Sequence, residues 1–335
     1  MTRRKFLEKA VVGQSVLASA GMALSQNNGD AIPRRPLGKT GLEVSILGLG
    51  GYHLGSAETE GTAKRIVDQA IDAGINFFDN CWDYHQGKSE EWMGSALKGK
   101  RDRVVLMTKV CTHGRGKDVA MRMLEESLRR LQTDHLDVWQ IHEVIYYDDP
   151  DLIFAAGGAI EALAEAKKQG KVRFVGFTGH KDPEIHLKML SHNYPFDAVQ
   201  MPLNCFDASF RSFEQHVVPE ANRRGIAVLG MKSLGGSGEM VRHGGITAAE
   251  GLRYAMSLPV AVTISGMESP EVLSQNLAIA RGFKPLSANE MKALRARCEN
   301  DASDGRYELF KTSKKYDGDE GRKTHGYPTA EELPA

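Results

Sequence analysis

Three ionisable side chains follow apolar runs that have the composition of buried strands. Asp79 ends the run INFFD, Lys109 ends RVVLMTK and His142 ends LDVWQIH. A phenol, Tyr84, comes five residues after Asp79. Neighbouring parallel strands lie about 4.8 Å apart and end at the same edge of their sheet, so we expect the four side chains to form one cluster.

An acid, an ammonium, a phenol and an imidazole together can protonate a carbonyl oxygen that receives a hydride. The pKa of a free phenol lies near 10. A neighbouring ammonium favours the phenolate, so we expect Lys109 to lower the pKa of Tyr84. Asp79 would hold Lys109 charged, His142 would orient the reacting oxygen, and Tyr84 would be the general acid. No metal is expected, because the histidines are scattered and Lys109 would repel a cation.

Eight repeats of one unit can position this cluster. After residue 34, a short apolar run, a polar turn and an amphipathic stretch follow one another eight times, and the runs do not alternate cleanly, which is typical of parallel strands buried on both faces. Gly74, Gly170 and Gly225 precede runs at positions typical of helix C-caps. The pattern predicts an α/β fold, a (β/α)8 TIM barrel. The predicted strands are 44–51, 75–79, 103–109, 136–142, 172–179, 197–201, 226–232 and 260–266, and the predicted helices are 62–73, 89–98, 118–131, 158–169, 183–191, 212–224, 247–257 and 270–281.

A doubly wound sheet is the alternative fold. It usually carries a Gly-rich phosphate turn after its first strand. In GLGGYHLG, His53 stands where the third glycine of GxGxxG belongs, and GRGKD lacks the first glycine and the Ser/Thr of a P-loop. The barrel is therefore preferred.

The segments that flank the barrel divide the chain into three parts. RRPLGKTGLEVS predicts an N-terminal β-hairpin that turns at Gly38–Gly41 and plugs the barrel. A helix is expected over 288–298, followed by a polar C-terminal tail for which disorder and a loop over the barrel both remain open. The expected parts are a signal segment (1–30), the barrel with its hairpin (31–287), and the helix with its tail (288–335).

Composition excludes several classes of partner. The chain has 43 Lys+Arg and 43 Asp+Glu, and this zero net charge argues against binding of nucleic acid or of an anionic membrane surface. No apolar stretch reaches the roughly 18–20 residues of a membrane span. The cysteines Cys81, Cys111, Cys205 and Cys298 form no CxxC motif and predict buried free thiols; a disulfide among them cannot be paired from the sequence.

The N-terminus resembles a twin-arginine export signal. Arg3 and Arg4 precede Phe-Leu and a mildly apolar stretch that ends in small residues. The resemblance implies that the twin-arginine machinery exports the folded protein to the periplasm, with cleavage near Ala20 or Ser25. The alternative is a basic, amphipathic arm on a cytoplasmic enzyme.

Long motifs spread over residues 34–283 resemble those of the aldo-keto reductase family. They include PLGKTGLEVSILGLGG, AIDAGINFFDNCWDYHQGKSEEWMGSAL, DRVVLMTK, SLRRLQTDHLDVWQIH, GKVRFVGFTGH, VQMPLN and GMKSLGGSG. The family's catalytic tetrad falls on Asp79, Tyr84, Lys109 and His142. The resemblance implies hydride transfer between a nicotinamide dinucleotide and an aldehyde or ketone, or an alcohol in reverse, with Tyr84 as the proton donor. NADP(H) is favoured and NAD(H) is the alternative.

The same resemblance implies a set of cofactor contacts. Thr178 and Gln200 would hold the carboxamide, and Met231 takes the ring-stacking position. Gly266 and Val272 stand where phosphate-preferring members often carry Lys and Arg, which leaves the choice between NADP and NAD open. The remaining implied contacts are Lys232, Leu234 and Gly235 for the phosphates, Met267, Ser269, Gln275 and Asn276 with Gly266 for the adenosine, and Gly50 and Gly51 for close backbone approach.

Loops above the second to fourth strands and the tail are expected to hold a small carbonyl or sugar-like substrate. The alternative function is a dinucleotide-binding regulatory or partner-docking module with little turnover; the intact tetrad favours the enzyme. The sequence does not indicate an oligomeric state. The candidate substrate residues are Trp82, His85, His113, Tyr146 and Tyr147.

Overall fold

The computed structural model of the chain describes residues 31–110, 116–319, 323 and 329–332. The expected export signal and His113 lie outside these residues. Among the described helices, none combines the length and the apolar character that crossing a bilayer requires.

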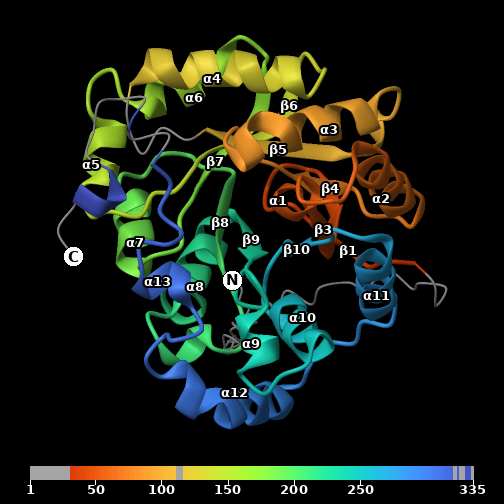
Figure 1. Cartoon of the computed structure of the whole chain (residues 1–335). Helices are drawn as coiled ribbons and strands as arrows, with labels where there is room; N and C mark the ends of the chain where they lie inside the picture. The colour runs from red at the N-terminus through yellow and green to blue at the C-terminus, as the bar shows by residue number, and fades with distance from the viewer. Residues whose placement is uncertain (1–30, 111–115, 320–322, 324–328, 333–335) are drawn as a thin grey trace, which may run out of the picture.

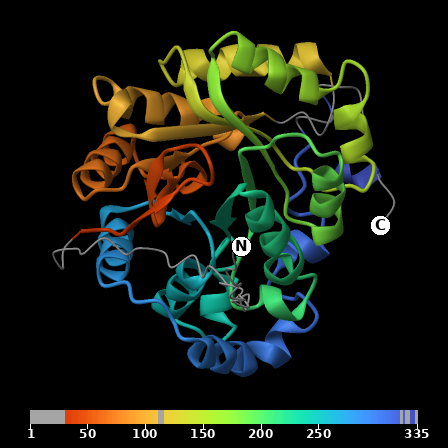
Figure 2. The ribbon, with the colours of Figure 1, turned by 180° about the vertical axis from the view of Figure 1, so that it is seen from behind.

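Eight parallel strands close into a barrel that helices surround in both views (Figures 1 and 2). Consecutive strands pair around the ring, and the last, β10, pairs with the first, β3. A closed ring has no edge strands, so it confirms the (β/α)8 barrel and excludes the open doubly wound sheet. The barrel strands are β3 (Leu47–Gly50), β4 (Phe77–Asp79), β5 (Val105–Val110), β6 (Leu136–Ile141), β7 (Val172–Thr178), β8 (Ala198–Pro202), β9 (Ala227–Met231) and β10 (Val262–Gly266).

The eight predicted helices are all present, with ends within two residues of the expected ones. Four short helices that the periodicity did not indicate lie in loops, because one helical turn is too short to show an amphipathic repeat. They are α1 (Gly51–Leu54), α5 (Asp149–Phe154), α9 (Glu239–Arg242) and α13 (Leu309–Thr312). The predicted helices correspond to α2 (Glu60–Asp72), α3 (Lys88–Leu97), α4 (Lys117–Arg130), α6 (Ala159–Lys168), α7 (Pro183–Ser191), α8 (Phe213–Arg224), α10 (Ala248–Ser257) and α11 (Pro270–Arg281).

The first predicted strand is divided between two structures. Of residues 44–51, the first two belong to β2 (Glu43–Ser45), which pairs antiparallel with β1 (Arg34–Pro36) in the predicted hairpin. Only β3 belongs to the barrel, and Gly51 already begins α1. The sequence does not indicate the boundary between β2 and β3, because both strands bury apolar side chains and the apolar run is continuous across it.

The hairpin covers the end of the barrel opposite its C-terminal strand ends. Leu37 and Val44 are fully buried in a cluster with strand residues such as Phe77 and Leu229. The Arg35 guanidinium donates hydrogen bonds to the carbonyls of Met256 (2.7 Å) and Val260 (2.8 Å). The expected N-terminal plug is thus packed into the barrel core.

The C-terminal segment folds back onto the barrel. Helix α12 (Ala288–Ala302) is longer than predicted and begins at a Ser287–Glu290 capping box. In α13, the fully buried Lys311 forms ion pairs with Asp207 (2.7 Å) and Glu308 (3.0 Å). Figures 1 and 2 both place the following segment beside α5 and α7. Of the two alternatives for the tail, its described part up to Asp319 is the loop over the barrel.

Removal of the Leu37 side chain tests the plug. Leu37→Ala should lower the free energy of unfolding by about 3 kcal/mol, because it leaves a cavity in a fully buried site. The matched control Leu42→Ala, in the half-buried part of the same hairpin, should cost about 1 kcal/mol. Urea unfolding followed by circular dichroism measures both, and equal losses would contradict the plug.

Candidate active site

The inward face of the barrel changes from apolar to polar toward the C-terminal ends of the strands. Phe77 and Val105 belong to the apolar cluster that includes the hairpin. Alternate strand residues share a face, so Asp79 lies above Phe77, and Lys109 lies four residues above Val105. The same alternation brings the following to the upper end: Asp79, Lys109, Gln140, His142, Gln200, Met231 and Gly266.

The four tetrad residues meet at this end. The Lys109 ammonium is fully buried; it donates to the Asp79 carboxylate, to the Asn80 carbonyl (2.8 Å) and to the Tyr84 hydroxyl (3.2 Å). The rings of Tyr84 and His142 meet edge to face with their centroids 5.9 Å apart. The predicted cluster is therefore a contact group in the folded protein.

A tight turn after β4 directs Tyr84 into the barrel. His85 and Gln86 have φ of 52° and 58°, the left-handed conformation that side-chain-bearing residues seldom adopt. Arg130 on α4 holds the turn from outside: its guanidinium donates to the Trp82 carbonyl (2.8 Å) and lies 3.4 Å from the buried Glu90 carboxylate. Such a conformation costs roughly 1–3 kcal/mol per residue, and the surrounding contacts offset it.

The pKa of Tyr84 shifts in the direction opposite to the one expected. Burial, followed by the negative charges of Asp79, Cys81, Asp83 and Glu143, raises it well above its ordinary value. Burial also raises the pKa of Asp79, although Lys109 opposes that shift. The expectation of a lowered phenol pKa was wrong, because burial disfavours the charged phenolate and the acids that face the phenol disfavour it further.

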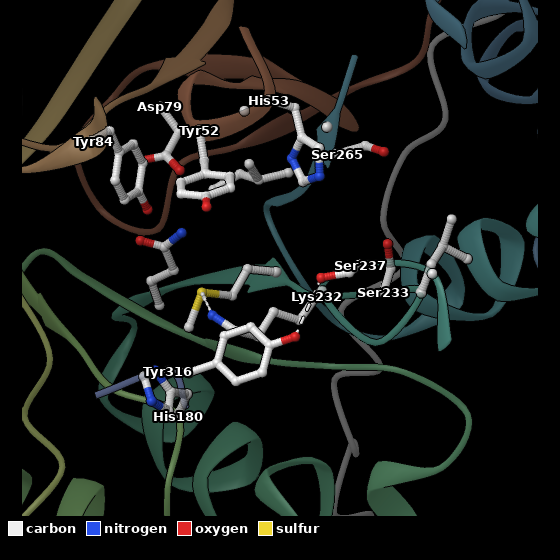
Figure 3. Close-up of a pocket in the computed structure, with 18 of the residues that line it drawn as sticks. Tyr52, His53, Asp79, Tyr84, His180, Lys232, Ser233, Ser237, Ser265 and Tyr316 are labelled. Carbon is white, nitrogen blue, oxygen red and sulfur yellow. Dashed lines mark hydrogen bonds between the residues drawn. The ribbon is translucent and has the colours of Figure 1, made fainter. Parts of the chain in front are cut away.

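A cavity of about 640 Å³ opens above the tetrad. Asp79, Tyr84 and Tyr52 lie on one side and Lys232 and Tyr316 on the other (Figure 3). This volume is within the range of small-molecule sites.

Six of the implied cofactor residues line the cavity: Gly50, Gln200, Met231, Lys232, Leu234 and Gly266. A Cβ at Gly266 would lie 2.2 Å from the His53 ring, so a larger residue there would require the His53 side chain to move. The others do not line it: Gly51, Thr178, Gly235, Met267, Ser269, Gln275 and Asn276. Ser269 caps α11, Asn276 donates to Ser265 (3.1 Å), and Gln275 is exposed.

Two polar groups in the cavity fit an anionic ligand that also carries an amide. Among the described residues, no carboxylate lies within ion-pair distance of the Lys232 ammonium, which lies 3.8 Å from the Met231 sulfur. Burial lowers the pKa of Lys232 to about 8. None of the described residues donates a hydrogen bond to the buried Gln200 Oε1. A dinucleotide with phosphates and a carboxamide satisfies both groups.

The described substrate candidates do not line the cavity: three of their side chains contact other residues, and the fourth is largely exposed. Trp82 donates to Glu126 (2.8 Å) and stacks under Arg130, and His85 hydrogen-bonds the Tyr52 carbonyl (2.7 Å). The remaining two are Tyr146, which donates to Asp317 (2.8 Å), and Tyr147, which is 60% exposed.

The tail supplies part of the cavity wall; the sequence indicated the tail for this role but none of its individual residues. Asp317 accepts hydrogen bonds from Lys181 (2.5 Å) and Tyr146, and the Gly318 N–H donates to Glu143 (2.8 Å). Burial alone would raise the pKa of Asp317, but the nearby His180 ring and the hydrogen bonds from Lys181 and Tyr146 outweigh burial and lower the pKa to about 2. Because the tail's partners lie 136 to 175 positions away along the chain, no local pattern indicates them.

Other lining residues were missed for a similar reason. Tyr52, 53% exposed, contacts the Tyr84 ring edge to face, and its position in a short loop helix carries no periodic signal. The further lining residues missed are His53, Asp83, Glu143, His180, Ser233, Gly236, Ser237, Gly238, Ile264, Ser265, Glu268 and residues 315–318.

The sequence matches the aldo/keto reductase family over residues 46–242, more than half of the chain, and the chain therefore belongs to this family of oxidoreductases. The uncharacterized oxidoreductase YqkF of Bacillus subtilis is 27% identical over 308 residues, which span 80% of this chain and 97% of YqkF.

Two solved structures share the fold. The holo form of the aldo-keto reductase AKR11C1 from Bacillus halodurans has a TM-score of 0.66 and 25% identity, with 80% of this chain and 96% of that chain covered. An aldo-keto reductase from Klebsiella pneumoniae in complex with NADPH has a TM-score of 0.63 and 25% identity, with 77% and 92% covered.

Proposed function

We propose that the protein is an NAD(P)H-dependent carbonyl reductase in which Tyr84 is the proton donor. The observation that carries this proposal is the Tyr84 hydroxyl, 3.2 Å from the Lys109 ammonium at the base of the cavity. The family membership and the NADPH bound by the Klebsiella relative support it.

In this proposal each residue has a role that its position permits. Lys232 binds the dinucleotide phosphates, and Gln200 accepts a hydrogen bond from the carboxamide. The bound dinucleotide supplies the hydride. The raised pKa of Tyr84 keeps the phenol protonated at neutral pH, so it donates its proton only when the carbonyl oxygen gains charge. His142 orients that oxygen, and Lys109 with Asp79 stabilises the phenolate that remains.

Loss of the phenol hydroxyl tests the proton donor. Tyr84→Phe should bind NADPH or NADH with a Kd within about threefold of the wild type, measured by tryptophan quenching. It should lose at least about 100-fold in kcat with small aldehydes, ketones and aldoses, because a general acid contributes roughly 10²–10⁴-fold. The control Tyr194→Phe, outside the cavity lining, should keep both values.

Two results would overturn the reductase. If neither dinucleotide binds, the cavity serves another ligand. If both bind and the wild type turns over no carbonyl compound, the protein is the alternative dinucleotide-binding module.

The affinity for the dinucleotide should depend on pH through Lys232. Its pKa of about 8 in the free protein means that the ammonium is present below pH 8 and lost above it. Bound phosphate favours the charged form, so the Kd for NADPH should be constant below pH 8 and rise above it. Lys232→Met should raise the Kd roughly 10- to 100-fold, the worth of one charge-assisted contact, and remove the pH dependence. The control Lys284→Met should keep the wild-type Kd and its pH dependence. A wild-type Kd that does not change with pH would contradict the role of Lys232 in binding the phosphates.

The choice of dinucleotide and the location belong to the same proposal. We take NADP(H) as the physiological cofactor. The ratio of the Kd values for NADPH and NADH tests this choice against NAD(H). We also take the protein as exported to the periplasm. Arg3→Lys with Arg4→Lys should then retain the protein in the cytoplasm and leave its N-terminus uncleaved, as cell fractionation and N-terminal sequencing would show. Cleaved periplasmic protein from this variant, or cytoplasmic wild type, would contradict export.

A further inference from the structure

Three metal-ligating side chains meet beside Tyr84. The Cys81 sulfur lies 3.0 Å from His142 Nδ1, and a carboxylate oxygen of Asp83 lies 3.8 Å from the same nitrogen. One donor atom of each residue lies within 4.8 Å of the other two. Cys81 is fully buried, while Asp83 and His142 line the cavity.

The donor set and its spacing suit zinc. Zinc binds thiolate, imidazole and carboxylate at about 2.3, 2.0 and 2.0–2.2 Å, and in a tetrahedron these bonds place the donor atoms about 3.3–3.6 Å apart. The Cys81–His142 and Asp83–His142 separations, 3.0 and 3.8 Å, bracket this range. Three protein ligands leave the fourth position open, and here it faces the cavity, because Asp83 and His142 both line it.

The positive charge of Lys109, a neighbour of this cluster, is already paired with a carboxylate. The Lys109 ammonium, which the sequence suggested would repel a cation, is directed to Asp79 and the Asn80 carbonyl. The part of Lys109 that approaches Cys81 is its backbone carbonyl, 3.6 Å from the sulfur.

We propose that Cys81, Asp83 and His142 form a binding site for a zinc-type divalent cation, and that its occupation inhibits the reductase. On binding, the Cys81 thiol gives its proton to solvent as the thiolate–metal bond forms, and His142 binds through Nδ1 with its proton on Nε2. The open position then places a metal-bound water or anion next to Tyr84, where a carbonyl oxygen would lie. The inhibition rests on the proposed function; the site itself does not.

Cobalt reports the site without any enzyme assay. Chelator-treated protein titrated with Co²⁺ should bind one equivalent, with thiolate-to-cobalt charge-transfer absorption in the near ultraviolet and tetrahedral bands in the visible, and Zn²⁺ should abolish both. Cys81→Ser should lose the charge-transfer absorption, and Asp83→Asn should bind Co²⁺ at least about tenfold more weakly. Thermal unfolding of the metal-free variants shows whether each retains its fold.

Cys111→Ser and Cys298→Ser are the matched controls and should keep the wild-type spectrum. Failure to bind stoichiometric Co²⁺, charge-transfer absorption that persists in Cys81→Ser, or its loss in Cys111→Ser would overturn the site. Because the cobalt spectrum needs no dinucleotide, it tests the metal site even if the protein proves not to be a reductase.

Turnover of NADPH tests the inhibition. One equivalent of Zn²⁺ should suppress carbonyl reduction, and a chelator should restore it. Cys81→Ser, compared with its own metal-free rate, should need at least about tenfold more Zn²⁺ for the same suppression. Unchanged turnover in protein that holds stoichiometric zinc would overturn the inhibitory role.

Discussion

The buried ion pair between Lys109 and Asp79 constrains the upper end of the barrel. Desolvation of two charges is costly, and it is offset only where further polar groups complete their hydrogen bonds. Here the Asn80 carbonyl and the Tyr84 hydroxyl accept from the ammonium. Neighbouring strands β4 and β5 supply the two charges, so the pair requires the parallel register that the closed barrel fixes.

That register divides the barrel into two chemical layers. The lower layer is apolar and packs against the N-terminal hairpin through Leu37 and Val44. The upper layer carries the polar ends of the same inward faces, beneath a cavity. The hairpin excludes water from one end, which leaves the other end as the place where a ligand meets the buried charges.

Acidic side chains near Tyr84 connect the two proposals for this site, proton donation by Tyr84 and binding of an inhibitory cation. Burial, together with the negative charges around Tyr84, raises the pKa of the phenol and keeps its proton in place for a developing alkoxide. Two of these groups, Cys81 and Asp83, lie close enough to His142 to form the proposed cation site. The surroundings that keep Tyr84 protonated thus also contain the three ligands through which a zinc-type cation would inhibit the reductase.

The sequence by itself determined the eight strand–helix units, the hairpin and the tetrad. Those features depend on local periodicity, on glycine caps and on charged residues at the ends of apolar runs, which are all readable over a few residues. Only the tertiary structure decided the cavity wall from Tyr316 and Asp317, the direction of the Tyr84 pKa shift and the grouping of Cys81 with His142. Each of these depends on distances between residues far apart in the chain, because burial and Coulomb interactions follow spatial separation and leave no periodic trace in the sequence.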